Sequence, residues 1–199
     1  MRIKQMKMKS KKRIAIFVSG SGTNMENIAK RAEADELNCT INLVVCDQPG
    51  AKALERSAAL KLETFVIERK NFKTKQEFEV RIDAELRQRN IEAIFLAGYM
   101  RILGPDFVRA WKSKILNVHP SLLPKFPGAH AIQDAFRAHA KETGVTIHFV
   151  DEGVDSGPVI LQRSVPIQPD DTLATLEARI HAVECDLYPE AIHLFLKGI

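Results

Sequence analysis

The residues with the clearest chemical potential lie in the segment 116–128, whose sequence is LNVHPSLLPKFPG. An apolar run precedes it, and if that run is a strand, the alternation of side chains places Asn117 and His119 on one face. Pro120 lacks a backbone N–H group, so the strand is predicted to end there. An amide and an imidazole would then lie together at the carboxyl end of a strand, where open α/β sheets build their sites. Such a pair suits acyl transfer, because it can stabilise an oxyanion and move a proton.

Taken alone, the same residues also fit a structural role, in which His119 caps a strand end and Asn117 bonds local backbone. The chemical interpretation depends on three further segments.

The first is a glycine-containing turn between a predicted strand and a predicted helix. It consists of Gly20, Ser21, Gly22, Thr23 and Asn24. Glycines let backbone approach an anion closely, and a helix N-terminus offers free N–H groups, so one phosphate group is the expected ligand. The third glycine of a dinucleotide fingerprint and the lysine of a Walker A loop are both missing. A plain helix-capping turn stays an alternative.

The second and third segments are the loops 151–158 and 98–103. An aspartate of loop 151–158 near His119 would raise the pKa of that imidazole and hold it in place, although three acids and two glycines also suit a solvated turn. In loop 98–103, apolar residues around Arg101 favour a pocket for a flat, partly acidic ligand, and ordinary core packing is the alternative.

Apolar patterns predict the elements that position these segments. Nearly continuous apolar runs are typical of buried parallel strands, and Phe78, Ile82 and Leu86 form the i, i+4 stripe of an amphipathic helix. The predicted strands are residues 13–19, 41–46, 63–67, 94–97, 146–150 and 159–165; the predicted helices are residues 24–34, 51–60, 75–89, 130–140 and 172–196. This order indicates an α/β fold. We expect a doubly wound, mostly parallel, Rossmann-like sheet with an antiparallel C-terminal strand addition and a long C-terminal helix.

Three polar residues of the C-terminal half receive a structural interpretation at this point. His148 alternates with apolar neighbours and is interpreted as a hydrogen-bonded core histidine. His181 and Glu184 are three residues apart on the last predicted helix, and we interpret them as surface residues.

The chain of 199 residues is basic, with a formal charge of +4, but the charge is not spread evenly. Seven cations come first, with no acid among them: Arg2, Lys4, Lys7, Lys9, Lys11, Lys12 and Arg13. Without these seven, 22 of the 29 basic residues remain against 25 acidic ones, so the rest of the chain has a formal charge of −3. We interpret residues 1–12 as a basic, disordered tail and residues 13–199 as a single domain. No nucleic-acid motif accompanies the tail, so no nucleic-acid partner is expected.

Composition excludes several classes of protein. The apolar runs are too short to span a bilayer, and no secretory signal is present, so we expect a cytoplasmic protein without a membrane partner. Three cysteines without a C-x-x-C motif and six histidines without a ligand pattern predict no metal site. A monomer and a homodimer are equally compatible with the sequence.

With these motifs assembled, the chain resembles the folate-dependent glycinamide ribonucleotide formyltransferases of purine synthesis. The resemblance covers nearly the whole chain from Arg13 onward and is carried by four motifs in a fixed order. They are VSGSGTN at 18–24, AGYMRIL at 97–103, LNVHPSLLPKFPG at 116–128 and DEGVDSGPVILQ at 151–162.

The resemblance implies transfer of a formyl group from 10-formyltetrahydrofolate, as co-substrate, to the amine of N1-(5-phosphoribosyl)glycinamide. It implies Asn117, His119 and Asp155 as the catalytic set, and a cis peptide bond before Pro124. The implied phosphate and ribose site consists of Gly20, Ser21, Gly22, Thr23, Asn24, Lys75 and Glu184. The implied folate site consists of Met100, Arg101, Ile102, Leu103, Val150, Asp151, Glu152, Gly153, Val154 and Asp155. Lys75 stands where an arginine is common, and His181 where a glutamine is common.

Two relatives share the formyl-transfer motifs but fit less well. Methionyl-tRNA formyltransferase would need a C-terminal tRNA-binding domain, and formyltetrahydrofolate hydrolase a regulatory domain before the motifs; we expect neither in this chain. A non-catalytic binding module that uses the glycine turn and the tail would leave Asn117, His119 and Asp155 without a purpose.

Overall fold

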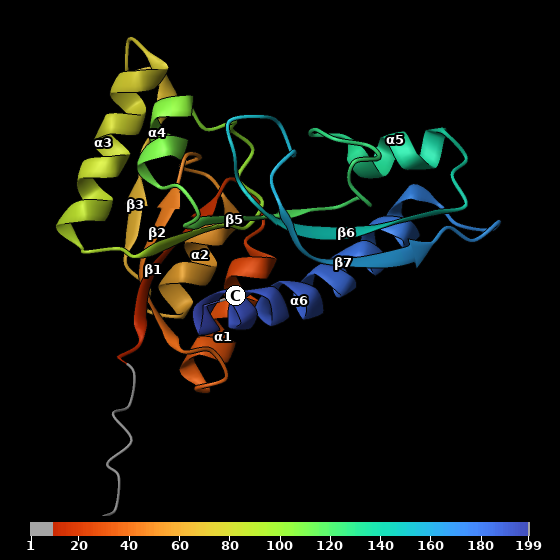
Figure 1. Cartoon of the computed structure of the whole chain (residues 1–199), viewed down its shortest axis with the longest axis horizontal. Coiled ribbons are helices and arrows are strands. Elements are labelled where there is room, and N and C mark those ends of the chain that lie inside the picture. Colours follow the sequence, from red (N-terminus) through yellow and green to blue (C-terminus); the bar gives the residue numbers. More distant parts are fainter. Residues whose placement is uncertain (1–9, 199) are drawn as a thin grey trace, which may run out of the picture.

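A seven-stranded sheet organises residues 10–198, which are the residues that the computed structural model describes (Figure 1). The strands are β1 (Lys12–Val18), β2 (Cys39–Cys46), β3 (Thr64–Val66), β4 (Ala93–Leu96), β5 (Ile115–His119), β6 (Glu142–Phe149) and β7 (Val159–Pro166). The helices are α1 (Thr23–Glu33), α2 (Lys52–Ala59), α3 (Lys75–Gln88), α4 (Pro105–Ala110), α5 (Ala131–Arg137) and α6 (Leu173–Lys197), with a 3-10 turn η1 (Arg69–Asn71).

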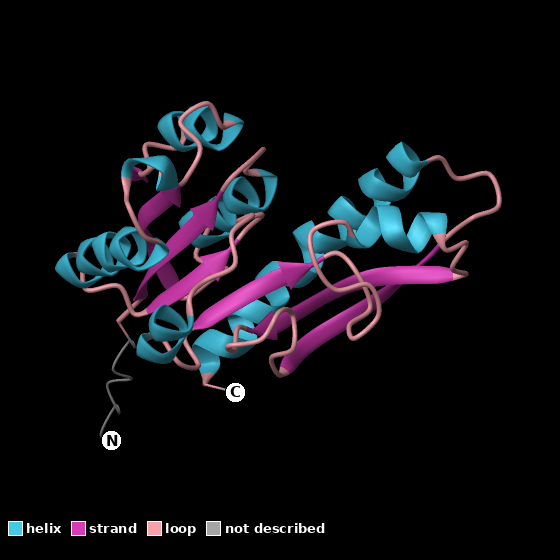
Figure 2. Ribbon diagram, turned by 90° about the horizontal axis from the view of Figure 1, so that it is seen from above, coloured by secondary structure: helices cyan, strands magenta, loops and turns pink. Residues whose placement is uncertain are grey.

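The strand order β3-β2-β1-β4-β5-β6-β7 confirms the predicted fold class. All pairs from β3 to β5 are parallel, whereas β6 is antiparallel to both β5 and β7. The parallel half is doubly wound, because its connecting helices lie on both faces of the sheet. The antiparallel strands extend the sheet away from this half, and α6 runs along them (Figure 2).

Several element boundaries differ from those predicted. β1 begins at Lys12, one residue early, and residues 1–9 of the predicted tail lie outside the described residues. β2 begins at Cys39 and β6 at Glu142, two and four residues before their predicted starts. Gly144 lies in the part of β6 that was not predicted. A Cβ at that position would lie 2.3 Å from the carbonyl oxygen of Arg163. A glycine inside a strand often marks such a close approach of another chain segment.

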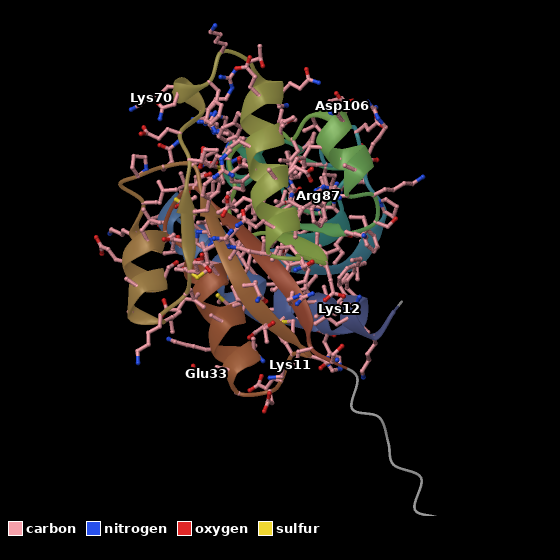
Figure 3. The ribbon with its side chains drawn as sticks, turned by 90° about the vertical axis from the view of Figure 1, so that its left-hand side faces the viewer. Lys11, Lys12, Glu33, Lys70, Arg87 and Asp106 are labelled. Atoms are coloured by element: carbon pink, nitrogen blue, oxygen red, sulfur yellow. The ribbon has the colours of Figure 1, made fainter. Side chains whose placement is uncertain are left out.

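Two apolar layers cover the two faces of the sheet. The layer on one face joins strand residues to α1, α2 and α6, with Met25, Ala53 and Ile180 fully buried. The layer on the other face joins β1, β2 and β4 to α3 and α4. Charged residues occupy the outer faces of these helices, and Figure 3 shows Arg87 and Asp106 projecting there. The second layer receives only Ile115 from β5 and no residue of β6. Loops, rather than α3 and α4, therefore meet the β5–β6 part of this face.

The buried hydroxyl of Tyr188 connects α6 to the middle of the sheet. It lies 3.1 Å from both the Leu96 carbonyl oxygen on β4 and the Leu116 carbonyl oxygen on β5. Complete burial raises the pKa of this phenol, so it stays a neutral donor. α6 is therefore fixed on the two strands that precede the candidate site.

We expect Tyr188→Phe to lower the free energy of unfolding by about 1–3 kcal/mol, because the one buried hydroxyl hydrogen that the two carbonyl oxygens share is lost. Urea unfolding measures the change. Tyr99→Phe is the matched control, since the Tyr99 hydroxyl is buried without a hydrogen-bond partner among the described residues. Its removal should leave stability nearly unchanged, and equal losses in the two variants would contradict the assigned role of Tyr188.

Candidate active site

The predicted pair Asn117 and His119 lies at the carboxyl end of β5, on one face of the strand. Ile115, Asn117 and His119 share this face, whereas Leu116 and Val118 point into the layer under α6. β5 ends at His119, as the following proline predicted. His119 is 4% exposed, and Asn117 is only partly buried.

The antiparallel strand β6 places His148 directly opposite Asn117, with 3.2 Å between Asn117 Nδ2 and His148 Nε2. His148 is 2% exposed, and burial lowers the pKa of its imidazole, so the ring is neutral. Its Nδ1 lies 2.8 Å from the Phe149 carbonyl oxygen, which only accepts. The single ring proton is therefore on Nδ1, and Nε2 accepts from the Asn117 amide. This contact fixes which end of the Asn117 side chain is the donor.

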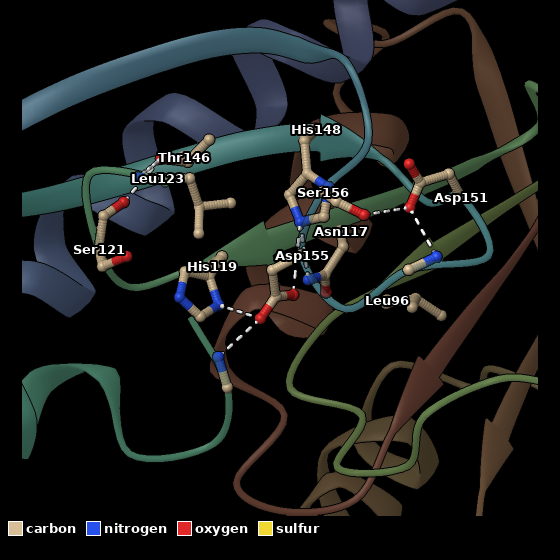
Figure 4. Close-up of polar contacts among 12 residues, drawn as sticks. Leu96, Asn117, His119, Ser121, Leu123, Thr146, His148, Asp151, Asp155 and Ser156 are labelled. Atoms are coloured by element: carbon tan, nitrogen blue, oxygen red, sulfur yellow. Dashed lines mark hydrogen bonds and ion pairs between the residues drawn. The ribbon is translucent and has the colours of Figure 1, made fainter. Parts of the chain in front are cut away.

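Asp155, in loop 150–158, places its carboxylate between the two histidines (Figure 4). Its Oδ2 lies 3.4 Å from His119 Nδ1, and its Oδ1 lies 3.7 Å from His148 Nε2. The backbone N–H of Gly128 donates to Oδ2 at 2.8 Å. Asp155 has a φ of 52°, a left-handed conformation that a non-glycine residue rarely adopts. Such conformations cluster at functional sites, where surrounding contacts hold them.

The loop between β5 and α5 holds the other side of His119. The Phe126 carbonyl oxygen lies 2.9 Å from His119 Nε2, so both ring nitrogens face oxygen acceptors. Thr146 of β6 supports this loop, because its hydroxyl donates to the Ser121 carbonyl at 2.6 Å and accepts from Leu123 N–H at 3.1 Å. The peptide bond between Leu123 and Pro124 is cis, which confirms the expectation from the family resemblance.

These side chains border a cavity of about 270 Å³ at the carboxyl edge of β4 and β5. Residues predicted to bind folate line it together with the catalytic candidates. The predicted folate residues that line the cavity are Met100, Arg101, Ile102, Leu103, Val150, Asp151, Gly153, Val154 and Asp155. Met100 and Ile102 are 68% and 65% exposed, an unusual exposure for large apolar side chains beside a cavity. Apolar walls with a few convergent polar groups are typical of small-molecule sites.

Two predicted folate residues have their charged groups paired elsewhere. Glu152 is absent from the cavity wall, and its carboxylate lies 2.6 Å from Arg109 Nη1 of α4. Arg101 lines the cavity, but its Nε lies 2.5 Å from Oδ2 of the buried Asp47. The Arg101 guanidinium is therefore held at the end of β2. The part of the cavity wall that Arg101 forms is positioned by Asp47, which does not itself line the cavity.

The predicted phosphate turn lies between β1 and α1, with Gly22 at the N-cap position in a left-handed conformation. Asn24 Nδ2 donates to Glu184 Oε2 at 3.0 Å, and His181 Nδ1 lies 2.9 Å from the same oxygen. Glu184 is only 6% exposed, so its interpretation as a surface residue was wrong. The hydrogen bond to Glu184 raises the pKa of His181. The turn and α6 thus form one polar cluster.

Among residues 10–198, Lys75 makes no hydrogen bond or ion pair with this turn. It begins α3, on the opposite face of the sheet from α1, and its ammonium lies 3.8 Å from Glu79 Oε1. Glu79 accepts from the Gly104 N–H at 2.8 Å, and burial raises the pKa of its carboxyl group. Lys75 is therefore placed beside the end of the loop 98–103.

Sequence reasoning missed the part played by His148. It was interpreted as a core histidine, and burial agrees, but its Nε2 contacts both Asn117 and Asp155. Only the register of β5 against β6 brings it there, and the alternation in residues 145–149 carries no sign of that register. Among the described residues, no group of three or more His, Cys, Asp or Glu side chains is arranged to hold a metal ion.

Comparisons with known proteins identify the family of this chain. The formyl transferase family matches residues 12–192. The chain belongs to the formyl transferase family. The family match covers β1 to most of α6 and therefore includes Asn117, His119 and Asp155.

Individual members of the family are similar over nearly the whole chain. This chain is 45% identical to phosphoribosylglycinamide formyltransferase of Bacillus subtilis, over 93% of this chain and 95% of that protein. Its structure matches glycinamide ribonucleotide transformylase 1 from Geobacillus kaustophilus with a TM-score of 0.90 and 51% identity, covering 93% and 98% of the two chains. It is also 38% identical to the trifunctional purine biosynthetic protein adenosine-3 of Drosophila melanogaster, over 99% of this chain but only 15% of that protein.

None of the helices within residues 10–198 of the formyltransferase combines the length and apolar character needed to cross a membrane.

The buried, neutral His148 predicts a pH dependence of stability. Its pKa is lowered in the folded protein, so the unfolded chain takes up the proton first as the pH falls. The contribution of neutral His148 to the free energy of unfolding is fully present above the ordinary histidine pKa of about 6.5. It is lost as the pH falls from there through the lowered pKa of the folded protein. Urea unfolding of the parent and of His148→Gln between pH 7.5 and 5.5 measures it. We expect a smaller fall in the variant; an identical fall would contradict this account of His148.

Proposed function

We propose that the protein is a cytoplasmic enzyme of purine biosynthesis that transfers a formyl group from 10-formyltetrahydrofolate to the amine of N1-(5-phosphoribosyl)glycinamide. The products are formylglycinamide ribonucleotide and tetrahydrofolate. The observation that carries the proposal is that Asn117, His119 and Asp155 line the wall of one cavity, with His119 and Asp155 paired at 3.4 Å. Membership of the formyl transferase family and the names of the most similar relatives agree with it.

The reaction needs an oxyanion to be stabilised and a proton to be moved. The substrate amine attacks the formyl carbon, and the carbonyl oxygen takes the electron pair. Asn117 donates to that oxygen through the N–H that His148 leaves free, because His148 uses only one of the two hydrogens on Nδ2. His119 is the proposed second donor: its Nδ1 faces Asp155, and in this role its Nε2 exchanges the Phe126 carbonyl oxygen for the formyl oxygen.

Asp155 is the proposed acceptor for the amine proton, directly or through a water molecule. The tetrahedral intermediate then collapses, the bond from the formyl carbon to N10 of the folate breaks, and N10 takes up a proton. The product is an amide, and tetrahydrofolate leaves. No covalent enzyme intermediate and no metal take part in this scheme.

Binding roles follow from the location of each segment. The apolar wall formed by residues 100–103, with the loop 150–155, is the proposed folate site, with Glu152 at its outer edge because Arg109 holds it. The turn of Gly20, Ser21, Gly22, Thr23 and Asn24 is the proposed phosphate site. Glu184 is the proposed ribose contact, since its Oε1 is not used by Asn24 or His181. Lys75 stays a predicted phosphate residue.

The test is a formyl-transfer assay that follows tetrahydrofolate release with and without the ribonucleotide amine. We expect His119→Ala and Asn117→Ala each to lower kcat by about 10²-fold or more, since each removes one donor to the oxyanion. His193→Ala, which removes an exposed imidazole from α6, is the matched control and should keep the parental rate.

The same assay separates the alternatives. Release of tetrahydrofolate without the amine would identify a hydrolase, and no release in either condition from a folded protein would reject the enzyme assignment.

A further inference from the structure

Two carbonyl groups of the glycine turn, those of Gly20 and Ser21, point toward α2. The Gly20 carbonyl oxygen accepts from the N–H of Ala53, in the first turn of α2, at 3.1 Å. The next one along, the Ser21 carbonyl oxygen, accepts from Nε of Arg56 at 2.9 Å. Figure 1 shows α2 beside α1.

These contacts determine where the neighbouring N–H groups point. Within residues 10–198 the only cis peptide bond precedes Pro124, so the two peptide groups of the turn are trans. In a planar trans peptide the C=O and the following N–H point in opposite directions. Carbonyl groups held on α2 therefore direct the N–H groups of Ser21 and Gly22 away from α2. Neither N–H has a hydrogen-bond partner among the described residues.

The turn also lies so close to α2 that its position is closely defined. A Cβ on Gly22 would come within 2.7 Å of the Ala53 Cβ, and Gly22 has a φ of 74°. Successive N–H groups that end in a left-handed residue form an anion-binding concavity, and here it continues into the free N–H groups of α1. One contact, from Arg56, holds the peptide group that contains the Gly22 N–H.

Arg56 has a second partner, the carboxylate of Glu26 in the first turn of α1. Glu26 also pairs with Lys30 at 2.7 Å. The ion pair holds the Arg56 guanidinium across the gap between α1 and α2, and so orients its Nε toward Ser21. Arginine suits this role because its planar guanidinium presents several donors in a fixed arrangement, which a lysine ammonium lacks.

We infer that Arg56 is a positioning residue for the substrate phosphate: by holding the Ser21 carbonyl, it directs the Gly22 N–H at that phosphate. The inference rests on the proposed function, since it takes a phosphorylated substrate in the turn. It differs from the predicted role of Lys75, because Arg56 acts through the backbone of the turn and contacts no substrate atom.

The experiment measures KM for the ribonucleotide, KM for the folate and kcat for Arg56→Ala and Arg56→Lys. We expect KM for the ribonucleotide to rise about tenfold in Arg56→Ala and nearly as much in Arg56→Lys, the effect of one lost hydrogen bond. The folate KM and kcat should stay near parental values. Arg31→Ala is the matched control, because Arg31 is equally exposed, at 37%, and pairs with Glu36 at the other end of α1.

A charge effect is separated from a geometric one by the double variant Arg56→Ala with Glu26→Gln. If Arg56 only cancelled the charge of Glu26, the double variant would recover the parental KM, and the inference would be overturned. Full retention of affinity in Arg56→Lys would overturn it as well. Persistence of the raised KM in the double variant supports it.

Calorimetric binding of ribose 5-phosphate gives a second readout that needs no formyl transfer. Weaker binding by Arg56→Ala than by Arg31→Ala, at equal melting temperatures, supports the inference even if the parent transfers no formyl group. Equal binding by these two variants would reject the inference and leave the proposed function standing.

Discussion

The register of the antiparallel pair β5 and β6 is the constraint on which the candidate site depends. It places Asn117 opposite His148 and His119 opposite Thr146. Because strand side chains alternate with a period of two, a slip of one residue in either strand would carry that strand's polar side chains to the face under α6. The apolar residues between them, including Val118 and Ile147, hold this register by filling the core. Burial of these apolar residues therefore also keeps the polar site assembled.

Two loops then complete what the strands begin. Asp155 comes from the loop after β6, and the carbonyl of Phe126 and the N–H of Gly128 come from the loop after β5. Neither loop relies on its own contacts alone: Thr146 supports one, and the Gly128 N–H ties Asp155 of the other to it. Site geometry held on strands is more precise than geometry held on loops alone, and here the loops are fastened to strands.

The sequence predicted the parallel half of the sheet well, because its elements are marked by local signals. Apolar runs mark buried strands, and the proline after His119 marks the end of β5. The residue patterns alone did not predict which distant side chains meet, although the family resemblance grouped Asp155 with His119 and Glu184 with Asn24. His148 belongs to the site through strand register, Glu184 is buried through contact with Asn24, and Arg56 reaches Ser21 because α2 packs on the turn. Each is a contact over more than 30 residues, for which periodicity and composition carry no information.

The topology also explains how two substrates meet in one site. The glycine turn follows β1 and the apolar loop follows β4, and these parallel strands are neighbours. Ser19 joins the two segments, because its N–H donates to the Gly98 carbonyl at 3.0 Å and its hydroxyl accepts from the Met100 N–H at 2.9 Å. Adjacent strands are about 4.8 Å apart, so the two loops leave the sheet within one strand spacing. Under the proposed function, the phosphate site and the folate site are thus fixed relative to one another by backbone bonds. The sheet itself therefore sets the spacing at which the proposed amine and formyl donor are held.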